Sequence, residues 1–185
     1  MNTQLPRLSV KEVTRRTWAD FDALFSAKGS PGYCWCMAWR ATAAEKRSRD
    51  PALLKQAMKA RVDGQVPVGL LGYLDAQPVA WCSVAPGTSF RGLRKDVAAS
   101  GEVWAITCFF VRREHRGQGL AKALLQAAVE HARRRGAKAV EGYPVDADSP
   151  SYRFMGFVPL FEQAGFSEVA RAGTRRHVVS KPLGL

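Results

Sequence analysis

Two glycines, Gly117 and Gly119, stand where they could bind phosphate groups. They separate an apolar segment, typical of a strand, from a helical pattern that begins at Leu120. Glycine lets the backbone approach a ligand closely, and the first turn of a helix offers unpaired N–H groups and a partial positive charge. Arg112 and Arg113 add positive charge beside the loop. The pattern predicts a site for a pyrophosphate group.

The glycine spacing differs from two common phosphate loops. A dinucleotide-binding G-x-G-x-x-G would need glycine where this chain has Lys122, and the pattern G-x-x-x-x-G-K-[ST] is absent. The run Arg116-Gly117-Gln118-Gly119-Leu120-Ala121 instead resembles the Q/R-x-x-G-x-G/A motif of the GCN5-related N-acetyltransferases, the GNAT superfamily. The run Glu162-Gln163-Ala164-Gly165-Phe166 resembles the Gly-Phe turn of that family's later motif, and the order of expected elements also matches the family.

The resemblance implies an N-acetyltransferase that moves an acetyl group from acetyl-CoA directly to an amine. It implies that the pantetheine arm of the cofactor binds backbone groups at a bulged, splayed strand end, at Phe109, Phe110 and Val111. It also implies that backbone N–H groups hold the pyrophosphate, contributed by Arg116, Gly117, Gln118, Gly119, Leu120 and Ala121.

Acetyl transfer to an amine needs a base for the amine proton and donors for the tetrahedral oxyanion. Many relatives also use a Tyr to protonate the leaving thiolate, but the matching residue here is Phe161, which has no such proton. We expect Glu141 to be the base, because some relatives place a catalytic Glu on the strand after the long helix. Tyr143 shares the strand face of Glu141 and could supply a hydroxyl. The alternatives are that Glu141 pairs with an Arg and that Tyr143 only fills the core.

An aromatic-rich segment, residues 33–40, is the candidate acceptor site. Aromatic side chains surround apolar ligands, and Arg can clamp a carboxylate. We therefore expect the acceptor to contact Tyr33, Trp35, Trp39 and Arg40. The pattern Cys-Trp-Cys-x-x-x-Arg in this segment resembles one found in a bacterial subgroup of the superfamily that has no agreed substrate. The alternative is that these residues simply bury the first helices. A small amine, an aminoglycoside-like drug, an amino acid and a protein N-terminus all remain candidate acceptors.

The four cysteines do not form a metal-binding pattern. A closed zinc site usually has two pairs of ligands, each spaced by two to four residues, whereas Cys34 and Cys36 form a single C-x-C. We therefore expect no metal. Without a secretory signal we also expect no structural disulfide. The cysteines are predicted to be reduced and buried as small hydrophobic residues, and for Cys108 this role is favoured over that of a nucleophile.

Hydrophobic patterning predicts one mixed α/β domain over residues 1–185. The expected strands are 8–13, 68–74, 79–84, 103–111, 137–143, 166–170 and 176–180, and the expected helices are 18–25 (capped by Thr17), 51–63 (capped by Asp50), 120–135 and 160–164. The resemblance implies a central, mostly antiparallel, splayed sheet flanked by helices. Residues 1–66 would hold the first strand and the acceptor-side helices, 67–145 the acetyl-CoA-binding core, and 146–185 the last helix and strands.

The chain of 185 residues has 28 Lys and Arg against 16 Asp and Glu, a formal net charge of +12. This excess predicts an anionic partner, such as cofactor phosphates, an acidic acceptor or a nucleic acid. A nucleic-acid-binding module is one alternative function, but the basic residues are spread from Arg7 to Lys181 and no helix-turn-helix, zinc-finger or RNP pattern occurs. A CoA-binding sensor without catalytic activity is another, because Phe161 replaces the usual acid.

The composition, 46% hydrophobic and 24% charged, is ordinary for a globular protein and excludes disordered, collagen-like and coiled-coil classes. No apolar run approaches the roughly 18 residues that a membrane span needs. The first residues lack the basic start and apolar stretch of a signal peptide. We therefore expect a cytoplasmic protein with no membrane partner. Partnered sheets are common in the superfamily, so a homodimer is compatible with this prediction.

Overall fold

Seven strands form one sheet in the computed structural model, which describes residues 8–93 and 101–184. The strand order is β1-β2-β3-β4-β5-β7-β6, and all neighbours are antiparallel except β4 and β5, which are parallel. The strands are β1 (Ser9–Glu12), β2 (Leu70–Leu74), β3 (Gln77–Pro86), β4 (Val103–Val111), β5 (Ala139–Gly142), β6 (Ser167–Ala172) and β7 (Arg176–Pro182). The mixed, mostly antiparallel sheet expected from the resemblance is confirmed.

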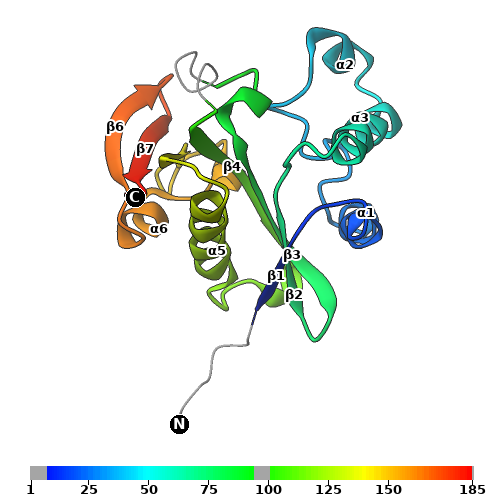
Figure 1. Ribbon diagram of the computed structural model, residues 1–185, viewed down its shortest axis with the longest axis horizontal. Coiled ribbons are helices and arrows are strands. Elements are labelled where there is room, and N and C mark those ends of the chain that lie inside the picture. Colours follow the sequence, from blue (N-terminus) through cyan, green and yellow to red (C-terminus); the bar gives the residue numbers. More distant parts are fainter. Residues whose placement is uncertain (1–7, 94–100, 185) are drawn as a thin grey trace.

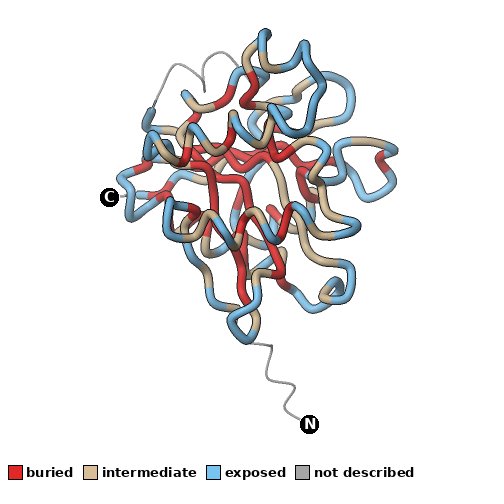
Figure 2. The backbone as a smooth tube through the Cα atoms, turned by 90° about the vertical axis from the view of Figure 1, so that its right-hand side faces the viewer, coloured by how far each residue is buried: buried red, intermediate tan, exposed pale blue. Residues whose placement is uncertain are grey.

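Helices cover the two faces of this sheet (Figure 1). On one face α5 (Leu120–Arg134) lies against β2, β3 and β4, and on the other face α1 (Trp18–Ser26) lies against β3. α3 (Pro51–Asp63) lies on the side of α1. Each face has its own cluster of buried apolar side chains. Figure 2 shows that the most buried backbone follows the central strands between these layers.

Two helix starts were predicted, and the structure confirms one of them. Asp50 caps α3 as expected, because its carboxylate accepts a hydrogen bond from the Ala52 N–H at 2.9 Å. Thr17 precedes α1, but its side chain does not cap that helix. Its hydroxyl instead donates to the Glu12 carbonyl at 2.8 Å and accepts from the Thr14 N–H at 2.9 Å. The cap prediction for Thr17 was wrong because the preceding turn uses the hydroxyl.

One short helix, α2 (Ala43–Ser48), was not predicted. It begins with a capping box, in which Thr42 and Glu45 each accept a hydrogen bond from the other's backbone N–H, at 3.2 and 2.7 Å. None of its residues is buried, so it has no apolar periodicity to reveal it. The capping box was the only available signal in the sequence.

Strand lengths near the site follow from the turns. Asp75 and Ala76 both have positive φ, which closes a tight hairpin and lets β3 begin at Gln77 rather than at residue 79. The β3–β4 pairing shifts between Ser83 and Val84, so β4 carries a bulge near its centre. The segment between β3 and β4 contains a short 3₁₀ turn, Gly87–Ser89, and its residues 94–100 lie outside the described part.

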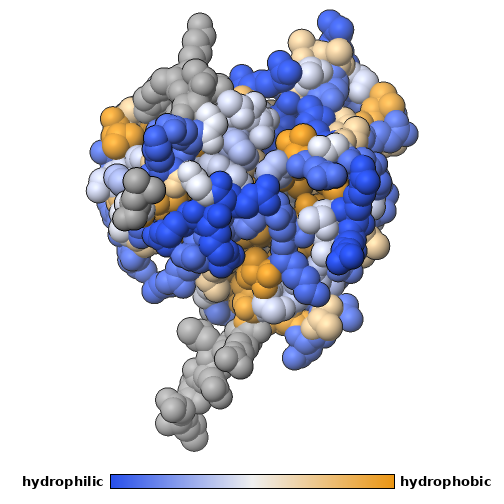
Figure 3. Space-filling model, in the orientation of Figure 1, coloured by the Kyte–Doolittle hydropathy of each residue, from blue (hydrophilic) through white to orange (hydrophobic). Residues whose placement is uncertain are grey.

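The last helix starts earlier in the chain than the sequence predicts. α6 (Val158–Gln163) begins two residues before the expected helix, and a 3₁₀ turn, Arg153–Met155, precedes it. No helix within residues 8–93 and 101–184 is long and apolar enough to cross a membrane. Figure 3 shows a face covered mainly by hydrophilic side chains, with apolar ones in small, separate groups.

Candidate active site

The site begins where β4 and β5 separate. β4 pairs with β5 only from Val103 to Ile106, opposite Ala139 to Gly142. β5 ends there while β4 continues to Val111, so in the described structure residues 107–111 have no strand partner on that side. Backbone N–H and C=O groups at an open strand edge are available to an extended ligand. This is the splayed strand end at which the resemblance places the pantetheine arm.

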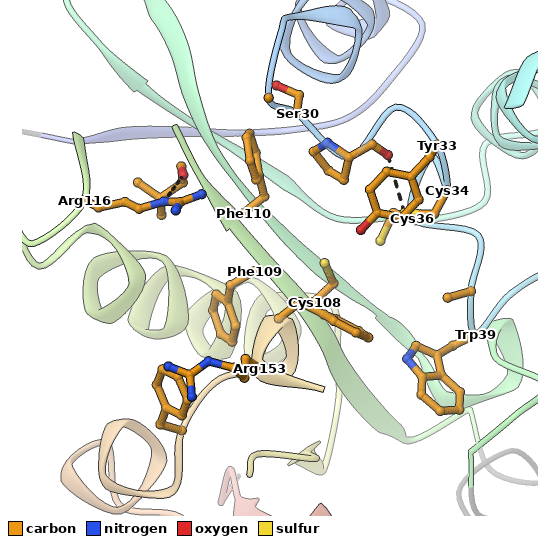
Figure 4. Close-up of a pocket in the computed structure, with 16 residues that line it drawn as sticks. Ser30, Tyr33, Cys34, Cys36, Trp39, Cys108, Phe109, Phe110, Arg116 and Arg153 are labelled. Atoms are coloured by element: carbon orange, nitrogen blue, oxygen red, sulfur yellow. Dashed lines mark hydrogen bonds between the residues drawn. The ribbon is translucent and has the colours of Figure 1, made fainter. Parts of the chain in front are cut away.

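A cavity of about 570 Å³ opens along this edge (Figure 4). Its walls come from the segment after α1, from the second half of β4, and from the chain around the turn that precedes α6. The described residues that line it are Gly29, Ser30, Pro31, Tyr33, Cys34, Cys36, Ala38, Trp39, Cys108, Phe109, Phe110, Val111, Arg116, Arg153, Phe154 and Phe157. This set is mainly aromatic and apolar, with three thiols and two arginines, and it contains no Asp, Glu or His.

The loop between β4 and α5 has the backbone that the glycine pattern predicts. Gly117 and Gly119 both have positive φ, at +77° and +76°, and a Cβ added at Gly117 would meet no protein atom within 4 Å. No side chain caps the start of α5. The Arg116 side chain donates to the Val111 carbonyl at 3.0 Å and so ties the loop to the end of β4. Open space beside a helix start fits a phosphate group.

The four residues predicted to bind the acceptor separate into two pairs. Tyr33 and Trp39 line the cavity, and the Tyr33 side chain is well exposed. Trp35 is buried against Phe21 and Phe25 of α1, outside the cavity. Arg40, only 1% exposed, also lies outside the lining. Both residues are thus buried outside the lining of this cavity, and their role in acceptor binding stays a prediction.

The two residues predicted to be catalytic lie together, as expected from their spacing. The Tyr143 hydroxyl donates to a Glu141 carboxylate oxygen at 3.0 Å. Both are buried, with Glu141 8% exposed, and neither lines the cavity. Glu141 stands opposite Ala105, in the part of the sheet where β4 and β5 are still paired. Its role as a base therefore stays a prediction.

Phe161 fills the space between the separating strands. Its ring is fully buried and contacts the rings of Phe109 and Phe166, with centroids 6.1 and 5.1 Å away. Gly142 and Gly156 lie so close to this ring that a Cβ at either would come within 3.0 Å of it. The ring is thus tightly packed, and it offers no proton to a leaving thiolate.

Three cavity residues that the sequence did not assign to the acceptor site come from the turn before α6. They are Arg153, Phe154 and Phe157. Arg153 donates to the backbone carbonyls of Ala147 and Ser149, at 2.6 and 3.3 Å, and its guanidinium lies 4.9 Å from the Phe157 ring centroid. No local spacing could have revealed them, because only the fold brings them opposite Tyr33 and Trp39.

The described residues also contain no cluster of three or more His, Cys, Asp or Glu side chains that could hold a metal ion.

Comparisons with known proteins agree with this geometry. The profile described as the Acetyltransferase (GNAT) family matches residues 18–157. No curated protein matches the chain. Among solved structures, an aminoglycoside acetyltransferase in complex with coenzyme A has a TM-score of 0.62 at 14% identity and covers 95% of each chain.

Two further solved structures with named sources have the same fold. The protein yncA from Salmonella typhimurium, solved with its cofactor acetyl-CoA, has a TM-score of 0.59 at 18% identity, covering 96% of this chain and 94% of its own. A ribosomal-protein-alanine N-acetyltransferase from Brucella melitensis has a TM-score of 0.57 at 21% identity, covering 95% and 99%. At these identities the likeness concerns the fold.

Proposed function

The chain belongs to the GNAT family of acetyltransferases and is an acetyl-CoA-dependent N-acetyltransferase, and on this premise we propose that its acceptor is a small amine with an apolar body and an acidic group. The observation that carries the proposal is the composition of the cavity wall. Its described residues are aromatic, apolar or basic, and none of them is Asp, Glu or His.

A polycationic acceptor does not suit such a wall. An aminoglycoside or a polyamine carries several positive charges, which need carboxylates for close binding. The described lining offers Arg116 and Arg153 instead, on a chain with a formal net charge of +12. An acidic group on the acceptor would be attracted to the same side chains that repel a polycation.

Trp39 offers both an apolar face and a polar contact. Its ring lines the cavity, while its indole nitrogen is buried and has no hydrogen-bond partner among the described residues. The Arg176 guanidinium lies 4.6 Å from the Trp39 ring centroid and 5.0 Å from that of Tyr152, and no described carboxylate lies within 4.0 Å of it. Arg176 is not among the described residues that line the cavity, so it would act on an acidic group through its charge, while the Trp39 ring would contact the apolar body of the acceptor.

The cofactor residues predicted from the family motif are part of the same proposal. We assign the pantetheine arm to the backbone of Phe109, Phe110 and Val111, and the pyrophosphate to residues 116–121. The open edge of β4 and the positive-φ glycines support this assignment. Bound acetyl-CoA supplies an acetyl thioester, and these residues would hold it along β4 with its acetyl end beside the aromatic wall.

Glu141 has a direct test. Glu141→Gln keeps the size of the side chain and an oxygen that can accept from Tyr143, but it removes the ionisable carboxylate. A strong fall in kcat near neutral pH would support Glu141 as the base. An unchanged kcat would remove it from that role.

An amine panel tests the acceptor class. We expect amino acids with apolar side chains to give higher kcat/KM values than polyamines or aminoglycosides in an assay of CoA release. Arg176→Ala should lower kcat/KM about tenfold for an acid-bearing amine and leave the matching neutral amine unaffected. Arg175→Ala is the matched control, because Arg175 contacts Ser151 instead of the aromatic pair. Preferred use of a polycation would overturn the proposal.

A further inference from the structure

Three exposed aromatic side chains gather around the mouth of the cavity. They are Tyr33, Phe154 and Tyr152, which are 73%, 41% and 37% exposed. Tyr33 and Phe154 line the cavity, and the Tyr152 ring centroid lies 6.4 Å from that of Phe154. Every aromatic residue of the chain lies in the described part, and only these three are exposed. Exposed apolar side chains that gather in one place mark a binding site.

Strained backbone positions hold this mouth on both of its sides. Trp35 and Cys36 have φ values of +47° and +55°, and they follow Tyr33 in the chain. Tyr152, with φ at +59°, precedes the turn that carries Phe154. Such conformations are uncommon for residues other than glycine, persist only where the surrounding structure holds them, and cluster at functional sites.

Trp35 explains why Tyr33 stays at the surface. The Trp35 ring packs into the core against Phe21 and Phe25 of α1, with centroids 6.1 and 5.7 Å away. The positive φ values at Trp35 and the next residue turn the chain there, so that Trp35 is buried while Tyr33 is exposed. Figure 4 shows the Tyr33 ring across the cavity from Arg153.

Trp39, Tyr152 and Phe154 form an aromatic row along the cavity. The Tyr152 ring centroid lies 6.2 Å from that of Trp39 and 6.4 Å from that of Phe154. The Arg176 guanidinium lies over the rings of Trp39 and Tyr152, and Arg153 fixes the turn through two backbone carbonyls. Rings that are held in place before a ligand arrives lose little freedom on binding, which favours affinity.

The composition of the lining favours an aromatic ligand over an aliphatic one. The described lining contains no Leu, Ile or Met side chain. Rings prefer offset-stacked or edge-to-face contacts with other rings, and these contacts contribute beyond the area that they bury. An aliphatic body would fill the same space without making them. The apolar lining consists mainly of the rings of Tyr33, Trp39, Phe109, Phe110, Phe154 and Phe157.

We propose that the apolar body of the acceptor is an aromatic ring that binds between Tyr33 and the aromatic row, an inference that rests on the proposed function. The substrate class is then an aromatic amino acid or a close analogue, which carries an amine, an acidic group and a ring. Tyr33 and Phe154 are specificity-determining residues, because they contact the ring and take no part in proton transfer.

Phenylalanine and cyclohexylalanine test the ring directly. They share the amine, the acid and the length of the side chain, but only phenylalanine has aromatic faces. We expect kcat/KM for CoA release to be about tenfold higher for phenylalanine, since contacts with two protein rings contribute about threefold each. Burial of apolar area alone predicts the reverse, because the saturated ring is the more hydrophobic one. Equal values, or a preference for cyclohexylalanine, would overturn the proposal.

Variants of the two exposed rings test where the acceptor ring binds. Tyr33→Leu and Phe154→Leu should each lower the preference for phenylalanine about threefold, mainly through a higher KM, because these rings act in binding. Tyr33→Phe should retain the preference, since it keeps the ring. Leu53→Ala is the matched control, because Leu53 is also exposed but lies outside the cavity lining. A preference that survives in both leucine variants, or a fall confined to kcat, contradicts the assignment.

Binding of the acetylated product gives a measurement that is independent of catalysis. The protein with bound CoA is titrated calorimetrically with N-acetylphenylalanine and with N-acetylcyclohexylalanine. The Kd should be about tenfold lower for the aromatic product, for the same reason as above. Equal Kd values would count against the ring site.

The outcomes separate this inference from the proposed function. If aliphatic amino acids are better acceptors than aromatic ones and polycations are poor, the aromatic site is wrong and the proposed function stands. If a polyamine or an aminoglycoside is preferred, both fail. A preference for phenylalanine that falls in Tyr33→Leu and not in Leu53→Ala supports both.

Discussion

The cofactor side of the cavity is formed by backbone, whereas the acceptor side is formed by side chains from three separate segments. The cofactor side is the end of β4 with residues 112–121, one continuous stretch of chain. The acceptor side joins residues 29–39, Cys108 of β4 and residues 153–157. A binding site formed by backbone groups needs glycines and a helix start at fixed positions along the chain, so it can be recognised as a sequence motif. A side-chain site needs only that the fold bring its parts together.

The largest expected effect comes from filling the cofactor side. Gly117→Val should weaken acetyl-CoA binding on the order of a hundredfold, about 2.7 kcal/mol, because the side chain enters the space meant for phosphate and strains a positive-φ position. Calorimetric titration measures this. Gly136→Val, at the other end of α5, is the control, since Gly136 has the same sign of φ and equally open surroundings. Equal loss in both variants would mean that strain alone is responsible.

The difference between the two sides explains what the sequence could predict. The strands, α5 and the glycine loop were predictable because hydrophobic periodicity and caps are local signals. The part of the cavity wall around Arg153 and Phe157 was not predictable, because no sequence pattern links these residues to Tyr33, which is more than a hundred positions away in the chain. Glu141 and Tyr143 were correctly predicted to be neighbours, since spacing by two on a strand fixes that. Whether they reach the cavity depends on where β5 ends, which no spacing reveals.

The cysteines show the same limit. They were expected to be inert and buried, and Cys82 is fully buried in the core. The sequence does place Cys36 four residues before Arg40, yet it cannot show that the Cys36 sulfur accepts hydrogen bonds from both Arg40 and Trp81. Those facts come from the register of β3 with β4 and from the packing of the segment after α1.

A smaller effect separates a structural arginine from a binding one. Arg40→Met should lower the free energy of unfolding by about 2 kcal/mol, because it leaves the Val68 carbonyl and the Ser83 hydroxyl without their buried donor. Arg116→Gln should cost less than about 0.5 kcal/mol, since its exposed side chain only bonds the Val111 carbonyl, while it weakens acetyl-CoA binding. Urea unfolding measures the first quantity. Equal losses of unfolding free energy in Arg40→Met and Arg116→Gln would contradict the proposed difference between the acceptor side and the cofactor side of the cavity.

The smallest effect is a pH dependence confined to the acceptor side. Hydrogen bonds from Arg61, and then from Thr42, lower the pKa of Glu45, which joins α2 to α3. A carboxyl whose pKa is lower in the folded than in the unfolded chain stabilises the fold above its unfolded pKa, and this contribution disappears as pH falls through the folded pKa. Glu45→Gln should therefore cost about 1 kcal/mol at pH 7 and progressively less below about pH 4.

Urea unfolding of wild type and Glu45→Gln at pH 7, 5, 4 and 3 measures that difference. Glu130→Gln is the control on the cofactor side, because Glu130 forms an exposed pair with Arg133 on α5 and should cost less than about 0.5 kcal/mol at every pH. A pH-dependent loss in Glu130→Gln as large as that in Glu45→Gln would mean that any surface ion pair stabilises this fold equally. A loss specific to Glu45→Gln would show that α2 stabilises the packing of the segment with Cys36 and Trp39 against α3. It would do so although none of the residues of α2 is buried.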